Sequence, residues 1–252
     1  MKKLENKVAI VIGGGGAIGR EIALQLAGEG AAIAVVDVMQ DSATKVAQEI
    51  VQLGGKATGY ALDITSFAKV TESVDRIAAE FGQLDILVNS AGGSARNKMA
   101  LYHELPVEVL DWMLAVNLHG PLYCIRAVVP HLIRQHYGKI INITSIVALG
   151  GMARCVDYAA AKGGMIAASK SLAIELGRYN INVNCVSPGK VQRNADDIDQ
   201  VAFAKQFSYV NRIGTQGDIA SMALYLALPE SDYITGQNFV VDGGRSLGLR
   251  GS

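Results

Sequence analysis

The sequence predicts one α/β domain, residues 1–252, built on a doubly wound parallel sheet of about seven strands with helices on both faces. Short apolar runs recur along the chain, and each is followed by a helical pattern. The composition is 50% hydrophobic with a mean hydropathy of +0.25, as expected for strands buried on both faces. No linker rich in Pro or Ser divides the chain, which favours one domain over two.

The charge balance excludes several classes of partner. The chain has 23 Lys and Arg against 23 Asp and Glu, so no global field would attract nucleic acid or an anionic membrane. The 4 His and 3 Cys show no metal-ligand spacing, so we expect no metal, and free thiols suit a reducing cytosol. No apolar run reaches the length of a membrane span or a signal-peptide core. We therefore expect a cytoplasmic protein.

The first unit is a strand, a glycine turn and a helix. Val8–Ile12 is apolar, residues 13–19 contain five glycines, and Arg20–Ala27 is amphipathic. Free backbone amides and the positive end of a helix make such a turn an anion site that suits the pyrophosphate of a dinucleotide. A flexible turn without a ligand is the alternative. The residues expected at the pyrophosphate are Gly13, Gly15, Gly16, Ala17 and Ile18.

Asp37 follows the second predicted strand, Ala32–Val36, about 20 residues beyond the glycines. A carboxylate at this place can accept both ribose hydroxyls of adenosine, and it would repel the 2′-phosphate of NADP. Residues 38–40 supply no cation to neutralise that phosphate. The pattern therefore favours NAD over NADP, unless Asp37 only caps the next helix.

Two further strands end in residues that suit the same site. The strand 57–62 precedes a helix that is capped by Thr65 or Ser66 and runs to Phe81, and the strand 84–88 leads into a small-residue turn. Such a turn lets a ribose lie against the backbone, although a simple tight turn is the alternative. The candidate residues are Asp63, Ile64, Asn89, Ala91 and Gly92.

A helix begins near Pro106 and continues to Asn117. A polar Asn inside an apolar helical stretch must find hydrogen bonds. The alternative is a helix that Asn117 and Gly120 interrupt.

The strand 139–143 ends in Thr144 and Ser145, and Tyr158 and Lys162 open an Ala-rich helix. Residues four apart share one helix face, so phenol and ammonium can converge. An ammonium near a phenol favours the phenolate, which makes the Tyr a usable proton donor and acceptor near neutrality. The Ser145 hydroxyl could hold a carbonyl oxygen. A solvated helix face is the alternative for the Tyr and Lys alone.

Taken together, these motifs resemble the short-chain dehydrogenase/reductase family. The resemblance runs from Lys7 to Gly244 and includes Pro188, Gly189 and Val191 after the strand 182–186. It departs from the family pattern at Ile12, Ala17, Ser90 and Arg193, where the family has Thr, Gly, Asn and Thr.

The resemblance implies a Rossmann-type fold and reversible hydride transfer between NAD and a secondary alcohol. Tyr158 would be the general acid/base, and Ser145 would bind the carbonyl oxygen. Lys162 would bind the nicotinamide ribose and lower the Tyr pKa, Asn117 would hold a water of the proton relay, and Asp63 would hold the adenine amino group. Alternatives are an NADPH-dependent 3-oxoacyl-type reductase and a non-catalytic nucleotide-binding protein.

Cations on the loops after the strands suggest the substrate. The loops after three strands carry Arg96, Lys98, Arg154, Lys190 and Arg193. An Arg can bind a carboxylate or phosphate through paired hydrogen bonds, so Arg96, Arg154 and Arg193 are the candidate substrate residues. We expect a small polar or anionic hydroxy compound, unless these are solvated loop charges.

A homotetramer is expected from two apolar surfaces. They are the Ala-rich face with Ala167, Ala168 and Ala173 and the apolar edge strand at residues 239–241. The alternative is that the alanines only pack the helix on its own sheet.

Overall fold

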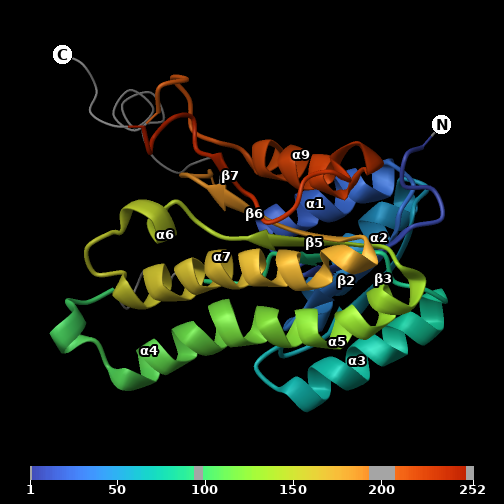
Figure 1. The fold of residues 1–252 in the computed structure, drawn as a ribbon, viewed down its shortest axis with the longest axis horizontal. Helices are drawn as coiled ribbons and strands as arrows, with labels where there is room; N and C mark the ends of the chain where they lie inside the picture. The colour runs from blue at the N-terminus through green and yellow to red at the C-terminus, as the bar shows by residue number, and fades with distance from the viewer. Residues whose placement is uncertain (1, 94–98, 193–207, 248–252) are drawn as a thin grey trace.

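The computed structural model describes residues 2–93, 99–192 and 208–247. A seven-stranded sheet, parallel throughout, has the strand order β3-β2-β1-β4-β5-β6-β7 (Figure 1). This architecture confirms the predicted fold class. The strands are β1 Val8–Ile12, β2 Ala32–Asp37, β3 Lys56–Ala61, β4 Ile86–Asn89, β5 Gly138–Ile143, β6 Ile181–Pro188 and β7 Asn238–Val241.

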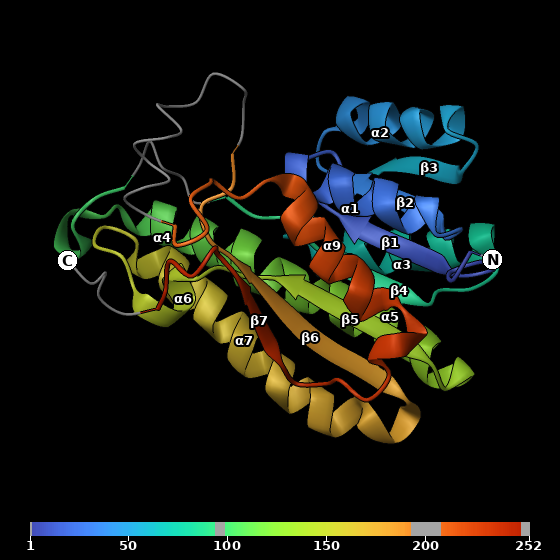
Figure 2. The same cartoon turned by 90° about the horizontal axis from the view of Figure 1, so that it is seen from above.

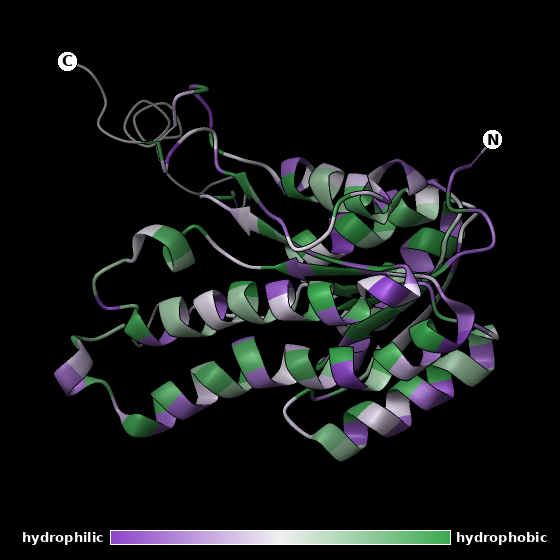
Figure 3. Ribbon diagram, in the orientation of Figure 1, coloured by the Kyte–Doolittle hydropathy of each residue, from purple (hydrophilic) through white to green (hydrophobic). Residues whose placement is uncertain are grey.

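Helices cover both faces of the sheet, so the central strands are buried on both sides. On one face lie α1 Ala17–Gly28, α2 Gln40–Gln52 and α9 Gln216–Ala227 (Figure 2). On the other face lie α3 Phe67–Phe81, α5 Gly120–Gln135 and α7 Val156–Leu176. Each face has its own cluster of buried apolar side chains, and Figure 3 shows hydrophobic residues along the strands and the helix faces next to them. This burial explains the apolar composition.

The shorter elements lie around the carboxyl ends of the strands or join the main helices. They are α4 Val107–Leu114, a π-helical turn Ala115–His119, α6 Val147–Gly150 and the 3₁₀ turns Tyr102–Glu104, Gly177–Tyr179 and Pro229–Ser231. None of the described helices is long and apolar enough to cross a membrane.

Strand order reverses beside β1, which pairs with β2 on one side and with β4 on the other. In open α/β sheets this reversal opens a crevice at the carboxyl ends of the strands, because the connections leave in opposite directions. The crevice lies where the glycine turn after β1 meets the turn after β4.

Two helix boundaries differ from those expected. The first helix begins at Ala17 rather than Arg20, because the extended Gly16 is already its N-cap. The helix expected near Pro106 continues past Asn117 and Gly120. It passes through the π-helical turn and continues as α5. Gly120 fits there because a Cβ would lie 2.6 Å from the side chain of Ile64.

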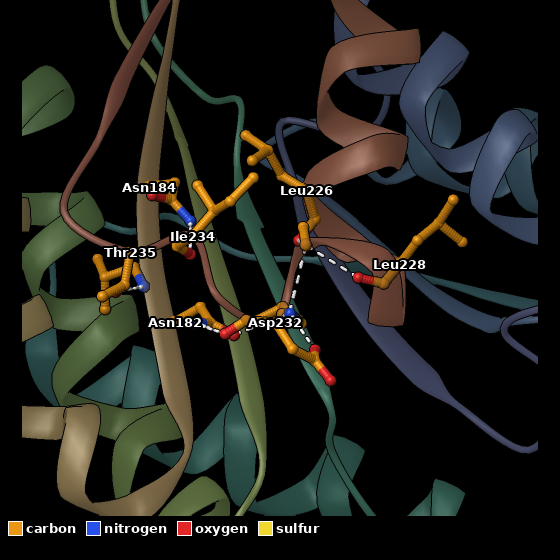
Figure 4. Close-up of polar contacts among 10 residues, drawn as sticks. Asn182, Asn184, Leu226, Leu228, Asp232, Ile234 and Thr235 are labelled. Atoms are coloured by element: carbon orange, nitrogen blue, oxygen red, sulfur yellow. Dashed lines mark hydrogen bonds and ion pairs between the residues drawn. The ribbon is translucent and has the colours of Figure 1, made fainter.

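The segment between α9 and β7 is hydrogen-bonded to the amino-terminal parts of β5 and β6, at the end of the sheet away from the crevice. Asn182 donates to the Asp232 carbonyl (3.0 Å) and Asn184 to the Ile234 carbonyl (2.8 Å), as Figure 4 shows. The buried Lys139 ammonium donates to Asn182 Oδ1 (2.8 Å) and Asp232 Oδ1 (2.6 Å). These contacts hold the segment that leads into β7.

Candidate active site

A cleft of about 1040 Å³ opens at the carboxyl ends of β1, β4, β5 and β6. It is large enough for a dinucleotide and a small substrate. Its walls are the glycine turn, the loop after β4, the start of α7 and the loops after β5, β6 and β7. The expected site residues that line it are Gly13, Gly16, Ala17, Ile18, Gly92, Ser145, Tyr158, Lys162, Pro188, Gly189 and Val191.

Glycines in the turn after β1 allow backbone segments to pack in close contact. Gly13 has φ +73°, and a Cβ on it would lie 2.5 Å from the Ala91 amide nitrogen. A Cβ on Gly19 would clash with the Gly13 carbonyl oxygen. Ala17, which departs from the family glycine, is the first residue of α1 and lines the cleft. The N-terminus of α1 therefore faces the cleft and offers backbone amides to an anion.

Asp37 ends β2 beside the glycine turn. Its Oδ2 accepts a hydrogen bond from the Gly15 amide (3.1 Å), and its Oδ1 accepts one from the Met39 amide (3.1 Å). The carboxylate is thus held next to the turn that would bind a pyrophosphate. This is the placement that the ribose of an adenosine requires.

Six expected cofactor residues are absent from the described lining of the cleft. Two of them, Gly15 and Asp37, lie beside the glycine turn and are hydrogen-bonded to each other. Asp63 is exposed, and hydrogen bonds from the Thr65 amide (3.0 Å) and hydroxyl (2.7 Å) lower the pKa of its carboxyl. Ile64 is buried in the core. Asn89 is buried and donates to Asn142 Oδ1 (2.8 Å) across the sheet, and the Ala91 backbone packs against Gly13.

Lys162 lies at the floor of the cleft. Its side chain is buried, and Nζ donates to the Ile143 carbonyl (3.0 Å) at the end of β5. Burial lowers the pKa of this ammonium to about 8, because the charged form loses its hydration. Nζ lies 5.8 Å from the centre of the Tyr158 ring, one helical turn earlier on α7. The expected pairing on one helix face is present.

Asn117 sits in the π-helical turn and points at the same place. Its Nδ2 donates to the carbonyls of Gly93 (3.0 Å) and Met113 (3.1 Å), while its buried Oδ1 has no hydrogen-bond partner among the described residues. A Cβ on Gly92 would lie 2.5 Å from this Oδ1 and 3.1 Å from Lys162 Nζ. Asn117 Oδ1 and the Lys162 ammonium therefore both lie close to Gly92. This Oδ1 can accept a hydrogen bond from a donor that enters the cleft.

Two hydroxyls follow β5, and they have different surroundings. Thr144 is buried, and its hydroxyl bonds the Val186 carbonyl (3.0 Å) and Ser187 Oγ (2.7 Å). Ser145 is half-buried, accepts from the Val147 amide (3.2 Å) and lines the cleft with Tyr158. Ser145 is thus the hydroxyl that can reach a carbonyl oxygen near Tyr158.

Of the expected loop cations that the structure describes, Lys190 lines the cleft and Arg154 does not. Arg154 is exposed and is absent from the described lining; it precedes the buried Cys155 with φ +65°. Arg96 and Arg193 lie outside the described residues. Arg245, which the sequence analysis missed, lines the cleft together with Lys190. The sequence did contain a signal for this residue, because Arg245 lies four residues after β7, at the carboxyl ends of the strands where the cleft opens.

A glycine turn with an Asp beside it at the end of β2, together with a Ser, a Tyr and a Lys that line one cleft, is typical of a nicotinamide-dinucleotide oxidoreductase on a doubly wound sheet. A family model described as enoyl-(acyl carrier protein) reductase matches residues 15–246. The chain belongs to the short-chain dehydrogenase/reductase family.

Three relatives illustrate the range within this family. The short-chain reductase protein NovJ of Streptomyces niveus is 38% identical, over 96% of this chain and 94% of the relative. The 3-oxoacyl-[acyl-carrier-protein] reductase FabG of Thermotoga maritima is 34% identical, over 96% and 98%. The structure of an NAD⁺-bound xylitol dehydrogenase superimposes with a TM-score of 0.90 at 29% identity, covering 96% of this chain and 100% of the other.

Proposed function

We propose that this protein interconverts a secondary alcohol and a ketone by hydride transfer with NAD(H), acting on a small polar or anionic hydroxy compound. The observation that carries the proposal is the position of the buried Lys162 ammonium, which lies 5.8 Å from the centre of the Tyr158 ring and, like Asn117 Oδ1, close to Gly92. This arrangement makes a proton available beside the cleft that would hold the cofactor.

The residues present fit a nicotinamide dinucleotide. The N-terminus of α1 would bind the pyrophosphate, Asp37 the adenosine ribose, and Tyr158 and Lys162 the nicotinamide ribose. Pro188, Gly189 and Val191 line the part of the cleft next to these two side chains. The bound cofactor supplies or accepts the hydride.

The protein's own groups handle the carbonyl oxygen and the proton. In the reducing direction the Ser145 hydroxyl donates to the carbonyl oxygen, and the Tyr158 phenol gives its proton to the same oxygen. In the oxidising direction the phenolate takes the proton of the alcohol. Lys162 stabilises the phenolate by its charge. Asn117 Oδ1 would accept a hydrogen bond from the water that returns protons to Lys162.

NAD is the proposed cofactor because the Asp37 carboxylate, held beside the glycine turn, would repel the 2′-phosphate of NADP. Next to it, Val38 and Met39 are exposed and uncharged, so they offer no compensation for that phosphate. A second candidate, an NADPH-dependent reductase of 3-oxoacyl thioesters, is favoured by the similarity to FabG over nearly the whole chain.

The test is a spectrophotometric assay of the purified protein. Each cofactor is offered with a panel of secondary alcohols, the matching ketones and a 3-oxoacyl thioester, including charged and neutral members. We expect NADH formation from secondary alcohols and little reaction with NADP. Turnover of the thioester with NADPH alone would select the second candidate. Binding of NADH without turnover of any member would favour a non-catalytic nucleotide-binding protein.

A further inference from the structure

The described part of the cleft is positively charged, although the protein as a whole is not. Lys162, Lys190 and Arg245 line it, and no Asp or Glu appears among its described lining residues. The chain has equal numbers of basic and acidic residues, so the charge is local to the cleft. Such a cleft attracts an anion.

The strand order separates Arg245 from the glycine turn. The glycine turn follows β1, Ser145 follows β5, and Arg245 follows β7, which is the last strand of the sheet. Because the strands are parallel, their loops stand in the same order along one edge. Arg245 therefore lies on the side of Ser145 that is away from the expected pyrophosphate site.

A rigid turn holds the backbone of Arg245. Asp242 Oδ1 accepts from the Gly244 amide (2.8 Å), and its Oδ2 accepts from the Ser246 amide (2.7 Å). Gly243 and Gly244 have φ +64° and +82°, values that favour glycine. A Cβ on Gly189 would lie 2.6 Å from Asp242 Cβ, so a glycine there lets the turn close against the loop after β6.

We infer that Arg245 is a specificity-determining residue that binds an anionic group of the substrate, and that the substrate is a small hydroxy acid or its oxo counterpart. This inference rests on the proposed function. Arg245 lines the cleft, and a guanidinium can bind a carboxylate through two parallel hydrogen bonds. A carboxylate held there and a carbonyl oxygen held at Ser145 and Tyr158 would orient the reacting carbon, because two contacts fix a small molecule better than one.

The experiment removes the charge and keeps an unbranched polar side chain, with Arg245→Gln. The matched control is Arg178→Gln, which removes an exposed guanidinium in the 3₁₀ turn before β6, at the opposite edge of the sheet. The probes are 2-oxobutanoate, 3-oxobutanoate and 4-oxopentanoate, each paired with its neutral primary amide. Reduction by NADH gives kcat/KM, calorimetry with NAD⁺-loaded protein gives the Kd of each probe without reaction, and fluorescence gives the Kd of NADH.

In the original protein we expect at least one acid to bind and react better than its amide. Arg245→Gln should weaken that acid by roughly 10-fold to 100-fold, mainly in KM and Kd, and leave the amide and NADH unchanged. The control should behave as the original protein. Equal binding of every acid and its amide would overturn the inference, as would a parallel loss of NADH affinity, which would assign Arg245 to the cofactor. Binding of acids without any turnover would instead count against the proposed function.

Discussion

Lys162 joins three parts of the cleft through one buried ammonium. Its Nζ binds the carbonyl at the end of β5, lies below the Tyr158 ring and faces Gly92 in the loop after β4. Burial lowers its pKa to about 8, so the charge depends on pH within the range in which proteins are studied. We therefore expect the charge of this one residue to affect both cofactor binding and the pKa of Tyr158.

A pH dependence of cofactor binding follows. Below about pH 8 Lys162 carries its proton and attracts the anionic cofactor; above it, the free protein must first take up a proton. We expect the Kd of NADH to rise by up to tenfold per pH unit above about 8. NADH fluorescence titrations in the Tyr158→Phe background exclude titration of the phenol. A Kd that does not change with pH in Tyr158→Phe would contradict the assignment of this pH dependence to Lys162. The same rise of the Kd in Lys162→Met would contradict it as well.

Asp37 is the second residue whose charge has a predicted consequence. Asp37→Ala should weaken NAD by about 10-fold, the scale of a lost charge-assisted hydrogen bond, and narrow the preference over NADP, because the repulsion of the 2′-phosphate is removed. Cofactor titrations measure both effects. Asp41→Ala, an exposed carboxylate in the first turn of α2, is the control. If the original protein already prefers NADP, the argument from Asp37 is wrong.

At this scale, spacing predicted some positions and missed others. Tyr158 and Lys162 share a face because any helix places residues four apart together. Arg154 did not meet the expectation, because a loop residue has no periodicity that sets its direction. Arg245 was missed although it follows the last strand, because its approach to the cleft also depends on the closure of the turn at Asp242 against Gly189, which the sequence does not show. The roles of the site residues stay predictions.

The two ends of the parallel strands have separate roles. The loops at the carboxyl ends shape the cleft, while at the amino ends the segment between α9 and β7 holds the last strand in place. There the fully buried Lys139 ammonium binds Asn182, Ser231 and Asp232. Removing the ammonium breaks three hydrogen bonds at a buried position, so this contact should affect stability rather than chemistry.

Lys139→Met should lower the free energy of unfolding by about 1–3 kcal/mol, with kcat unchanged in the folded protein. Urea unfolding followed by circular dichroism measures the loss. The control is Lys3→Met, which breaks an ion pair with Glu230 in the same segment, where both side chains are about half exposed. Such surface pairs contribute about 0–1 kcal/mol. Equal losses in the two variants would contradict a special role for the buried Lys139.

Element boundaries show what a single sequence cannot predict. The apolar strands were located to within about two residues, because their pattern contrasts with the polar turns. The π-helical turn at residues 115–119 has no such pattern, yet it sets the direction of Asn117 toward Gly92. The N-cap role of Gly16 was also hidden, because the backbone conformation of a glycine run cannot be read from its composition.

The whole molecule is a neutral protein with a positive cleft and apolar exposed elements. β7 is the edge strand of the sheet, as expected, and Val240 on it is 41% exposed. On α7, Ala167 and Ile174 are exposed. Ala173, expected at the interface, is instead buried in the core, because it faces the protein's own sheet.

We propose that these surfaces join four chains. Light scattering at micromolar concentration should give about four times the chain mass of 26.6 kDa. Val240→Asp, which places a charge on the edge strand, should shift the protein to a smaller species, while the exposed Tyr233→Ser should not. A monomer in the original protein would rule the assembly out.

The central claim, that Tyr158 moves the proton during hydride transfer, is tested most directly by Tyr158→Phe. This change removes one hydroxyl and keeps the ring, so NADH should still bind with nearly the original affinity. Turnover should fall by about 10²-fold or more, the usual loss when a general acid/base is removed. Tyr233→Phe, on a fully exposed ring, is the control. Near-normal turnover in Tyr158→Phe, measured as NADH formation from the best alcohol of the panel, would contradict the mechanism.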